Sequence, residues 1–169
     1  METTCLIRKM QTSDVKELSQ GFINQGWPGR EEILARYFLE QECGEREVLV
    51  AEVESALAGY ITILPCAKQG PFAEIYPELS DFNVFEPFQN QGIGNLLMEE
   101  AEKRVKLISD KVTLGVGLHS GYGPAQRLYI KRGYIPDGTG VWYQNHQPAM
   151  NAVCEDIGEL VLYLSKNLF

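Results

Sequence analysis

The segment that decides the fold is Val84-Phe85-Glu86-Pro87-Phe88-Gln89-Asn90-Gln91-Gly92-Ile93-Gly94-Asn95. It lies between an expected strand at 79–85 and the start of an expected helix. The first amides of a helix lack acceptors within the helix and the helix dipole is positive there, so a diphosphate can bind at such a start. Gly92 and Gly94 have no Cβ, which lets phosphate oxygens approach the main chain. The segment therefore predicts an anion site made of backbone groups, which needs no basic side chain.

The helix that follows this segment is amphipathic. Its buried face is predicted from apolar residues that recur every four positions, with two more alongside: Ile93, Leu97, Ala101 and Val105, then Leu96 and Ile108. Three acid-first pairs at i,i+4 spacing are expected on the opposite, solvated face: Glu99/Lys103, Glu100/Arg104 and Glu102/Lys106. One side of this helix is expected to contact the core and the other to face water.

The rest of the chain alternates short strands and helices. Strands are predicted at Thr4–Met10, Glu47–Val53, Gly59–Leu64, Leu79–Phe85, Val112–His119, Val141–Asn145 and Leu160–Ser165. Helices are predicted from Asp14 with Thr12 or Ser13 as cap, at Glu31–Glu42, and after Pro124 with Gly133 at the C-terminal end. The resulting order, β-α-α-β-β-β-α-β-α-β-β, predicts a mixed α/β (α+β) fold with helices on both faces of a mostly antiparallel sheet of six or seven strands.

One predicted strand carries two glycines on the same face. In 112–119 the apolar residues alternate with Thr113, Gly115, Gly117 and His119. Bare backbone at this face indicates either a ligand that lies close or a local bulge, and the pattern does not choose between them.

Composition bounds the class of protein. With 169 residues, one domain over 1–169 is expected. The net charge of −8 argues against nucleic acid as a partner, and it suits either a cationic small molecule or simple solubility. No stretch is typical of a membrane helix or a secretory signal, so a cytoplasmic protein without a membrane partner is expected. The four scattered cysteines and two histidines predict free thiols and no metal site.

Two other anion-binding motifs are excluded by the residues around the glycines. A P-loop requires GxxxxGK[ST], and the chain has none. A dinucleotide fingerprint requires a third glycine, but Leu97 and Ser120 stand at the two positions where it would fall. Nucleoside triphosphates and NAD are therefore not expected ligands.

At this point the chain resembles the GCN5-related N-acetyltransferases (GNAT). Gln89-x-x-Gly92-x-Gly94 is similar to the family's Q/R-x-x-G-x-G/A pyrophosphate loop, and Ala125-Gln126-Arg127-Leu128-Tyr129-Ile130-Lys131-Arg132-Gly133-Tyr134 is similar to its A-x-x-L-Y-x-x-x-G-F block. Ile7-Arg8, Asp14 and Leu18 suit its first strand and helix. The resemblance implies a single-domain acyl-CoA N-acyltransferase fold, acetyl-CoA as co-substrate, no metal, and a primary amine of a small molecule or peptide as acceptor.

The resemblance also implies roles for particular residues. Backbone groups of Phe82, Asn83 and Val84 would bind the pantetheine arm, and the Val84 amide would face the thioester oxygen. Gln89 belongs to the pyrophosphate loop. The diphosphate would be held by backbone amides of that loop, those of Asn90, Gln91, Gly92, Ile93, Gly94 and Asn95. Tyr129 aligns with the family's general acid, and a phenol with a pKa of about 10 can protonate a departing thiolate. Tyr122 stands where many members carry Asn, and Pro87 lies one place later than usual.

The proton acceptor for the amine stays open. Glu78, which falls where one branch of the family places its glutamate, Asp81, His119 and an ordered water chain are the candidates. The resemblance places the acceptor pocket among Gly26-Trp27-Pro28, the Pro65–Pro77 loop and Trp142-Tyr143. A covalent route through cysteine is disfavoured because only Cys66 lies anywhere near. The expected function is direct transfer in a ternary complex; a catalytically silent acyl-CoA sensor is the alternative, and a homodimer is possible.

Overall fold

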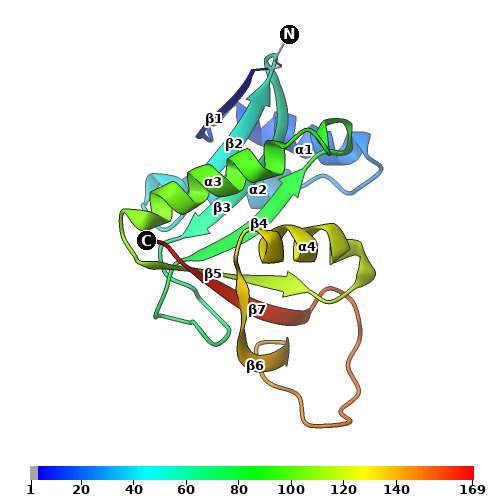
Figure 1. Cartoon of the computed structure of the whole chain (residues 1–169). Helices are drawn as coiled ribbons and strands as arrows, with labels where there is room; N and C mark the ends of the chain where they lie inside the picture. The colour runs from blue at the N-terminus through cyan, green and yellow to red at the C-terminus, as the bar shows by residue number, and fades with distance from the viewer. Residues whose placement is uncertain (1–3) are drawn as a thin grey trace. The chain divides into compact units, whose positions relative to one another are not determined.

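The computed structural model describes residues 4–169. Its elements are β1 (Cys5–Lys9), α1 (Asp14–Asn24), α2 (Glu31–Glu42), β2 (Glu47–Val53), β3 (Ala56–Leu64), β4 (Glu78–Val84), η1 (Glu86–Phe88), α3 (Ile93–Lys106), β5 (Lys111–Gly117), η2 (Ser120–Tyr122), α4 (Gly123–Lys131), β6 (Ile135–Tyr143) and β7 (Leu160–Asn167) (Figure 1). Apart from the two short 3-10 turns η1 and η2, this is the order that the sequence predicts. The mixed α/β class is confirmed.

The described residues form two compact units. The first holds the chain up to Pro65 together with Leu79–Arg104, and the second holds Cys66–Glu78 together with Val105–Phe169. The expectation of one domain over residues 1–169 stays a prediction.

The first unit is built on the strands β1, β2, β3 and β4, in that order. The pairs β1–β2 and β2–β3 are antiparallel. The β2–β3 hairpin turns at Glu54 and Ser55, whose φ angles of 49° and 69° are those of the tight turn that matches strand twist. The sequence placed this junction correctly, but β3 begins at Ala56, three residues before the predicted start.

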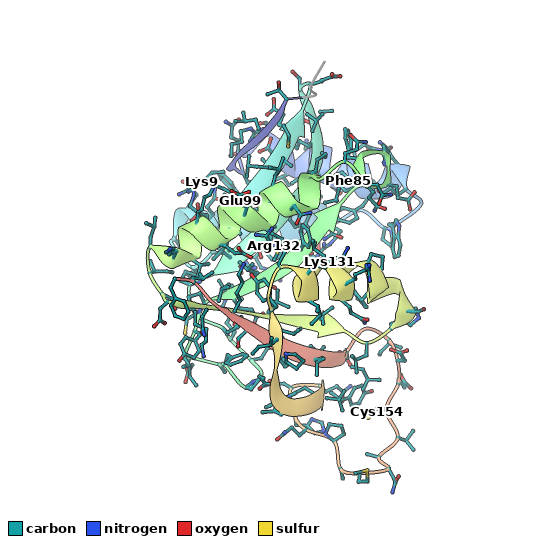
Figure 2. The ribbon with its side chains drawn as sticks, viewed as in Figure 1. Lys9, Phe85, Glu99, Lys131, Arg132 and Cys154 are labelled. Carbon is teal, nitrogen blue, oxygen red and sulfur yellow. The ribbon has the colours of Figure 1, made fainter. Side chains whose placement is uncertain are left out.

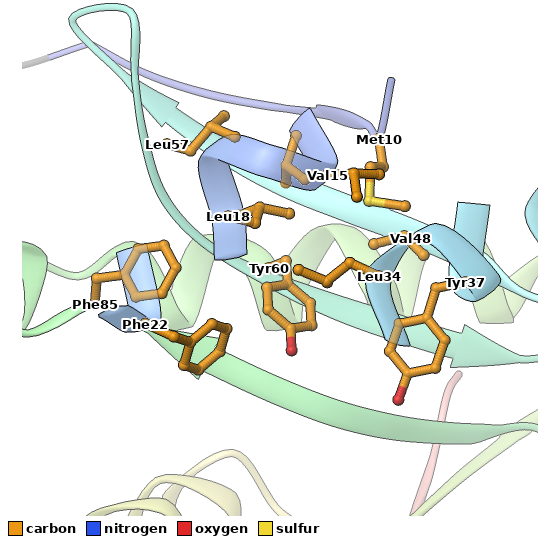
Figure 3. Close-up of a cluster of buried hydrophobic side chains, with 11 residues drawn as sticks. Met10, Val15, Leu18, Phe22, Leu34, Tyr37, Val48, Leu57, Tyr60 and Phe85 are labelled. Carbon is orange, nitrogen blue, oxygen red and sulfur yellow. The ribbon is translucent and has the colours of Figure 1, made fainter. Parts of the chain in front are cut away.

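Helices cover both faces of this unit's strands. α1 and α2 lie on one side and α3 crosses the other (Figure 1). Side chains of α1 and α2 meet those of β2 and β3 in a cluster that includes Leu18, Phe22, Leu34, Val48 and Tyr60 (Figure 3). Because α3 covers the opposite face, consecutive β2 residues from Val48 to Ala51 are fully buried.

The amphipathic helix α3 confirms most of its predicted pattern. Ile93, Leu97, Ala101 and Val105 are buried, and the pairs Glu99–Lys103 and Glu100–Arg104 close at 2.9 and 2.8 Å. Three expectations were wrong: Leu96 and Ile108 are exposed, and Glu102 is buried at 9% exposure instead of lying on the solvated face. The buried face is rotated relative to the predicted one, away from Leu96 and toward Met98 and Glu102, and the helix ends at Lys106 before reaching Ile108.

The start of α1 differs in detail from the prediction. Ser13 occupies the cap position, but its side chain makes no capping hydrogen bond. Asp14 instead accepts the amide of Gln11 at 2.7 Å and pairs with Arg8.

The second unit contains β5, β7 and β6 in that order, with both pairs antiparallel. The sequence predicted the strand after the helix at Pro124 to span Val141–Asn145, whereas β6 spans Ile135–Tyr143. Its register jumps between Pro136 and Val141, and the residues between them include Gly138 and Gly140 at φ 93° and 77°. This glycine-containing bulge interrupts the period-two pattern, which is why the first half of the strand was missed.

Side chains lie close to the Cβ positions of both glycines of β5. A Cβ on Gly115 would lie 2.9 Å from Val161 and 3.0 Å from the ring of Tyr163. A Cβ on Gly117 would lie 2.5 Å from the ring of Tyr122. Side chains of the same unit therefore lie close to both glycines, but Gly115 itself is exposed, and a ligand at this face stays a prediction.

Candidate active site

The predicted anion loop forms the link between β4 and α3 in the first unit. Gln89 donates its side-chain amide to the Val84 carbonyl at 2.9 Å, and Gln91 donates to the Pro87 carbonyl at 3.0 Å. These two bonds fold the loop back on the end of β4. Asn90 and Gly92 then turn the chain into the helix with φ angles of 60° and 80°.

The start of α3 has the features that an anion requires. A Cβ placed on Gly92 would meet no atom within 4 Å, so the space beside this residue is open. No acidic side chain lies in the first turn of α3. Because the helix dipole makes the N-terminal end of α3 positive, the end that holds Ile93, Gly94 and Asn95 attracts negative charge. The geometry fits a diphosphate held by main-chain groups.

The strand before the loop is held close to its neighbour β3. A Cβ on Gly59 would lie 2.2 Å from the Asn83 carbonyl oxygen and 2.9 Å from Val84 Cα, so only glycine allows this approach. The Phe85 amide, directly after β4, donates to the Ala58 carbonyl at 2.8 Å. β3 therefore fixes the path of residues 82–84, the segment that the sequence assigned to the pantetheine arm.

Asp81 is not available as a general base. Its carboxylate accepts two hydrogen bonds from Arg30, at 2.9 and 2.7 Å, one from the Tyr37 hydroxyl at 2.9 Å and one from the Asn83 amide at 2.8 Å. Burial lowers the pKa of Arg30, but the hydrogen bonds and charge of Asp81 outweigh that effect and raise it. Burial and the charge of Asp81 also raise the pKa of Tyr37. The carboxylate is occupied by donors that stay protonated.

His119 also has a structural task. Its Nδ1 accepts the Gly121 amide at 2.9 Å and so caps the short turn η2. A neutral imidazole has only one acceptor nitrogen, and here that nitrogen is occupied. This hydrogen bond favours a structural role for His119 over the role of base.

Tyr129 lies on α4 in the second unit. It is buried, and its ring centroid is 6.0 Å from that of Tyr134. Burial raises the pKa of the Tyr129 hydroxyl, so this group stays protonated at neutral pH. Gln126, one turn earlier on α4, donates to the Gly117 carbonyl at 2.8 Å and ties the helix to the end of β5.

Glu78 belongs to the same unit as Tyr163, a residue that the sequence did not single out. Burial, and then the negative charge of Glu78, raise the pKa of Tyr163. The Tyr163 ring packs edge-on against Trp142 at 5.8 Å, and a Cβ on Gly70 would lie 2.4 Å from it. The alternation of side chains in residues 160–165 predicted only that Tyr163 lies in a strand. Its neighbours Trp142 and Gly70 come from distant parts of the chain, so the sequence pattern could not indicate them.

Of the predicted wall segments, two come together in the second unit. The Gly70 amide donates to the Asn145 side chain at 2.7 Å, which joins the Pro65–Pro77 loop to the end of the Trp142-Tyr143 segment. Trp27, in the first unit, is 61% exposed.

No group of three or more ligands among residues 4–169 could hold a metal ion. All four cysteines are free thiols, with Cys66 exposed and Cys154 in the long loop between β6 and β7 (Figure 2). Within the same range no helix is both long and apolar enough to cross a bilayer.

Solved structures define the class of fold. A GNAT-family protein from Desulfovibrio desulfuricans is 16% identical and superposes with a TM-score of 0.73, over 97% of this chain and 99% of its own. A Salmonella typhimurium structure that holds acetyl-CoA as its cofactor is 17% identical, with a TM-score of 0.68 over 98% and 94% of the two chains. A ribosomal-protein-alanine N-acetyltransferase from Brucella melitensis is 22% identical, with a TM-score of 0.69 over 96% and 99%. The fold is that of the acyl-CoA N-acyltransferases.

The sequence itself identifies the family. The family model of the acetyltransferase (GNAT) domain matches residues 44–136, more than half of the chain. The chain belongs to the GNAT acetyltransferase family, as the two sequence motifs predicted. No curated protein matches the chain in sequence.

Proposed function

We propose that this protein is an N-acetyltransferase that moves an acetyl group from acetyl-CoA to a primary amine of a small molecule or peptide. The observation that carries the proposal is the loop 89–95, because it offers an anion site of backbone groups inside the region that the family model matches. The acetyl-CoA seen in the Salmonella typhimurium structure supports the choice of co-substrate.

Residues of the first unit bind the co-substrate in this proposal. The amides of residues 90–95 hold the diphosphate, with Gln89 bracing the loop against Val84. Main-chain groups of Phe82, Asn83 and Val84 bind the pantetheine arm in the manner of an added strand. In this proposal the Val84 amide stabilises the oxyanion of the tetrahedral intermediate.

Acetyl-CoA supplies a thioester that the amine attacks directly, with a thiolate as leaving group. Tyr129 donates its hydroxyl proton to that thiolate as it departs. A buried phenol with a raised pKa is protonated at neutral pH, which a general acid requires. The conjugate acid of the leaving group has a pKa near that of cysteine, about 8.5, so proton transfer from the phenol assists its departure.

The amine must lose a proton before it attacks, because its own pKa is about 10. Asp81 and His119 carry structural hydrogen bonds, so the proposal assigns this proton to Glu78, as the family resemblance implies, or to an ordered water chain. The Glu78 carboxylate also suits an acceptor that arrives as a cation, and the nearby Tyr163 and Trp142 provide aromatic surface for it.

The class of amine is the open part of the proposal. The likeness to the Brucella melitensis enzyme makes a peptide N-terminus a candidate beside polyamines and amino sugars. A homodimer and a cytoplasmic location remain predictions from the sequence.

The test is to incubate the protein with acetyl-CoA and a panel of amines, including peptides with N-terminal alanine, while following release of the coenzyme A thiol. Turnover with at least one amine is expected. Tyr129→Phe is expected to retain affinity for coenzyme A and to slow turnover by about 100-fold, the scale of general acid catalysis. Tight binding of acetyl-CoA without turnover on any amine would favour the acyl-CoA sensor instead.

A further inference from the structure

A left-handed residue interrupts the cofactor strand. Asp81, in the middle of β4, has φ 50°, a conformation that non-glycine residues seldom adopt. Such a conformation persists only where the surroundings enforce it. It lies directly before Phe82–Val84, so the direction of those three residues depends on how Asp81 is held.

The Asp81 side chain is held by a two-pronged ion pair. Arg30, directly before α2, binds both carboxylate oxygens, which is the strongest geometry for such a pair. The side chains are only 24% and 15% exposed. Tyr37, from α2 itself, adds a third donor, and Asn83 in β4 adds a fourth. The Tyr60 hydroxyl accepts a further bond from Arg30.

The carbonyl of Ser80, the residue directly before Asp81, is held by a second set of contacts. Ser80 accepts a hydrogen bond from the Thr62 hydroxyl at 2.7 Å, and Thr62 in turn accepts one from Arg46 at 2.7 Å. Arg46 pairs with Glu40 of α2, and its guanidinium lies 4.0 Å from the centre of the Tyr37 ring. The contacts that hold Asp81 and those that hold the Ser80 carbonyl therefore both lead back to α2 or to the arginines on either side of it.

Stability alone does not account for this arrangement. A buried ion pair is costly to desolvate, and apolar residues of similar size often give an equally stable protein. What an ion pair with two parallel hydrogen bonds adds is a fixed geometry. Here that geometry holds Asp81 in the left-handed conformation that interrupts β4.

We propose that Arg30 and Asp81 are positioning residues, which form a clasp that aims Phe82–Val84 at the pantetheine arm of coenzyme A. The clasp couples α2 to the cofactor strand and acts through the main chain rather than by touching the reacting atoms. This inference rests on the proposed function, since it presumes that coenzyme A binds along β4.

The experiment compares two ligands, coenzyme A and its nucleotide part without the pantetheine arm (3′-phospho-ADP), by calorimetry. Asp81→Asn and Arg30→Gln are each expected to weaken coenzyme A binding by about tenfold or more, because small displacements of binding groups are costly. Affinity for 3′-phospho-ADP, which uses only the loop 89–95, is expected to stay within about twofold. The double variant is expected to be no weaker than either single variant, because the two residues act as one pair.

Two further variants make the result interpretable. Lys103→Gln removes an exposed i,i+4 pair with Glu99 toward the C-terminal end of α3 and should change neither affinity. Tyr37→Phe removes a single donor from the carboxylate and should shift coenzyme A binding in the same direction by less. It therefore tests the clasp even where Asp81→Asn does not fold.

Four results would overturn the proposal. Equal losses for both ligands would show a merely structural role, and unchanged affinities would show no role. A loss of turnover in Asp81→Asn with intact coenzyme A affinity, and no effect of Arg30→Gln, would make Asp81 a base. Wild-type protein that fails to bind coenzyme A at all would refute the proposed function itself, and the clasp with it.

Discussion

Gly59→Ala is expected to damage coenzyme A binding from a position that touches no ligand. The new Cβ would lie 2.2 Å from the Asn83 carbonyl oxygen and 2.9 Å from Val84 Cα. A carbon and a carbonyl oxygen in contact stay about 3.3 Å apart, so the two backbones must separate by roughly 1 Å. Neither obstacle is a flexible side chain, and the movement falls on the main chain of β4.

Two effects follow from that displacement. Forced overpacking costs about 1–3 kcal/mol, which for a chain of this size corresponds to a fall in Tm of roughly 2–10 °C. A misplacement of about 1 Å in binding groups can also cost up to about 100-fold in activity. We therefore expect a modest loss of stability and a much larger loss of kcat/KM for acetyl-CoA.

The assay is thermal unfolding beside steady-state kinetics on an active amine. Gly123→Ala is the matched control, because Gly123 has a right-handed helical φ of −51° and open space around its Cβ. Because Gly123 precedes Pro124, which disfavours a helical conformation for a residue with a Cβ, that variant should lose a little stability but keep its affinity for coenzyme A. The reasoning is refuted if Gly59→Ala unfolds at the wild-type temperature and binds coenzyme A as tightly as Gly123→Ala does.

Three further outcomes test the site. Gly92→Val places a β-branched residue at φ 80° and fills the space assigned to the diphosphate, so calorimetry should detect no coenzyme A binding; retained affinity would show that the loop is misassigned. His119→Asn keeps an acceptor near the Gly121 amide, and kcat should stay within about threefold, whereas a loss of about 100-fold would restore His119 as the base. Because burial raises the pKa of Tyr129, kcat measured against pH should not fall through loss of this acid at or below the ordinary tyrosine pKa of about 10. A decline centred near pH 8 that Tyr129→Phe removes would contradict this assignment.

Local patterns were sufficient to predict most elements. α2 was predicted at its observed bounds, Glu31–Glu42, because one apolar side and two clear ends define it. The loop 89–95 was recognised because its glycines precede an amphipathic helix. β6 was misplaced because two glycines within it destroy the alternation on which strand prediction depends.

Long-range contacts could not be read from the sequence. Arg30 and Asp81 are 51 residues apart, and no periodicity links them. For the same reason Asp81 was a candidate for the general base, and the sequence could not show that the Tyr122 and Tyr163 side chains lie beside the β5 glycines. In each case a side chain from elsewhere in the same unit decides the role, so residue type and spacing alone were insufficient.

A protein with a net charge of −8 that holds a polyanion must rely on main-chain conformation. No lysine or arginine occurs between residues 69 and 102, which include β4, the loop and the start of α3. The attraction for the anion then depends on the direction in which the backbone amides point. That direction is set by residues that need not touch the ligand: Gly92 through its φ angle, Gly59 through its missing Cβ, and Asp81 through its ion pair with Arg30. Substitutions that alter backbone geometry should therefore affect this site more than substitutions that alter surface charge.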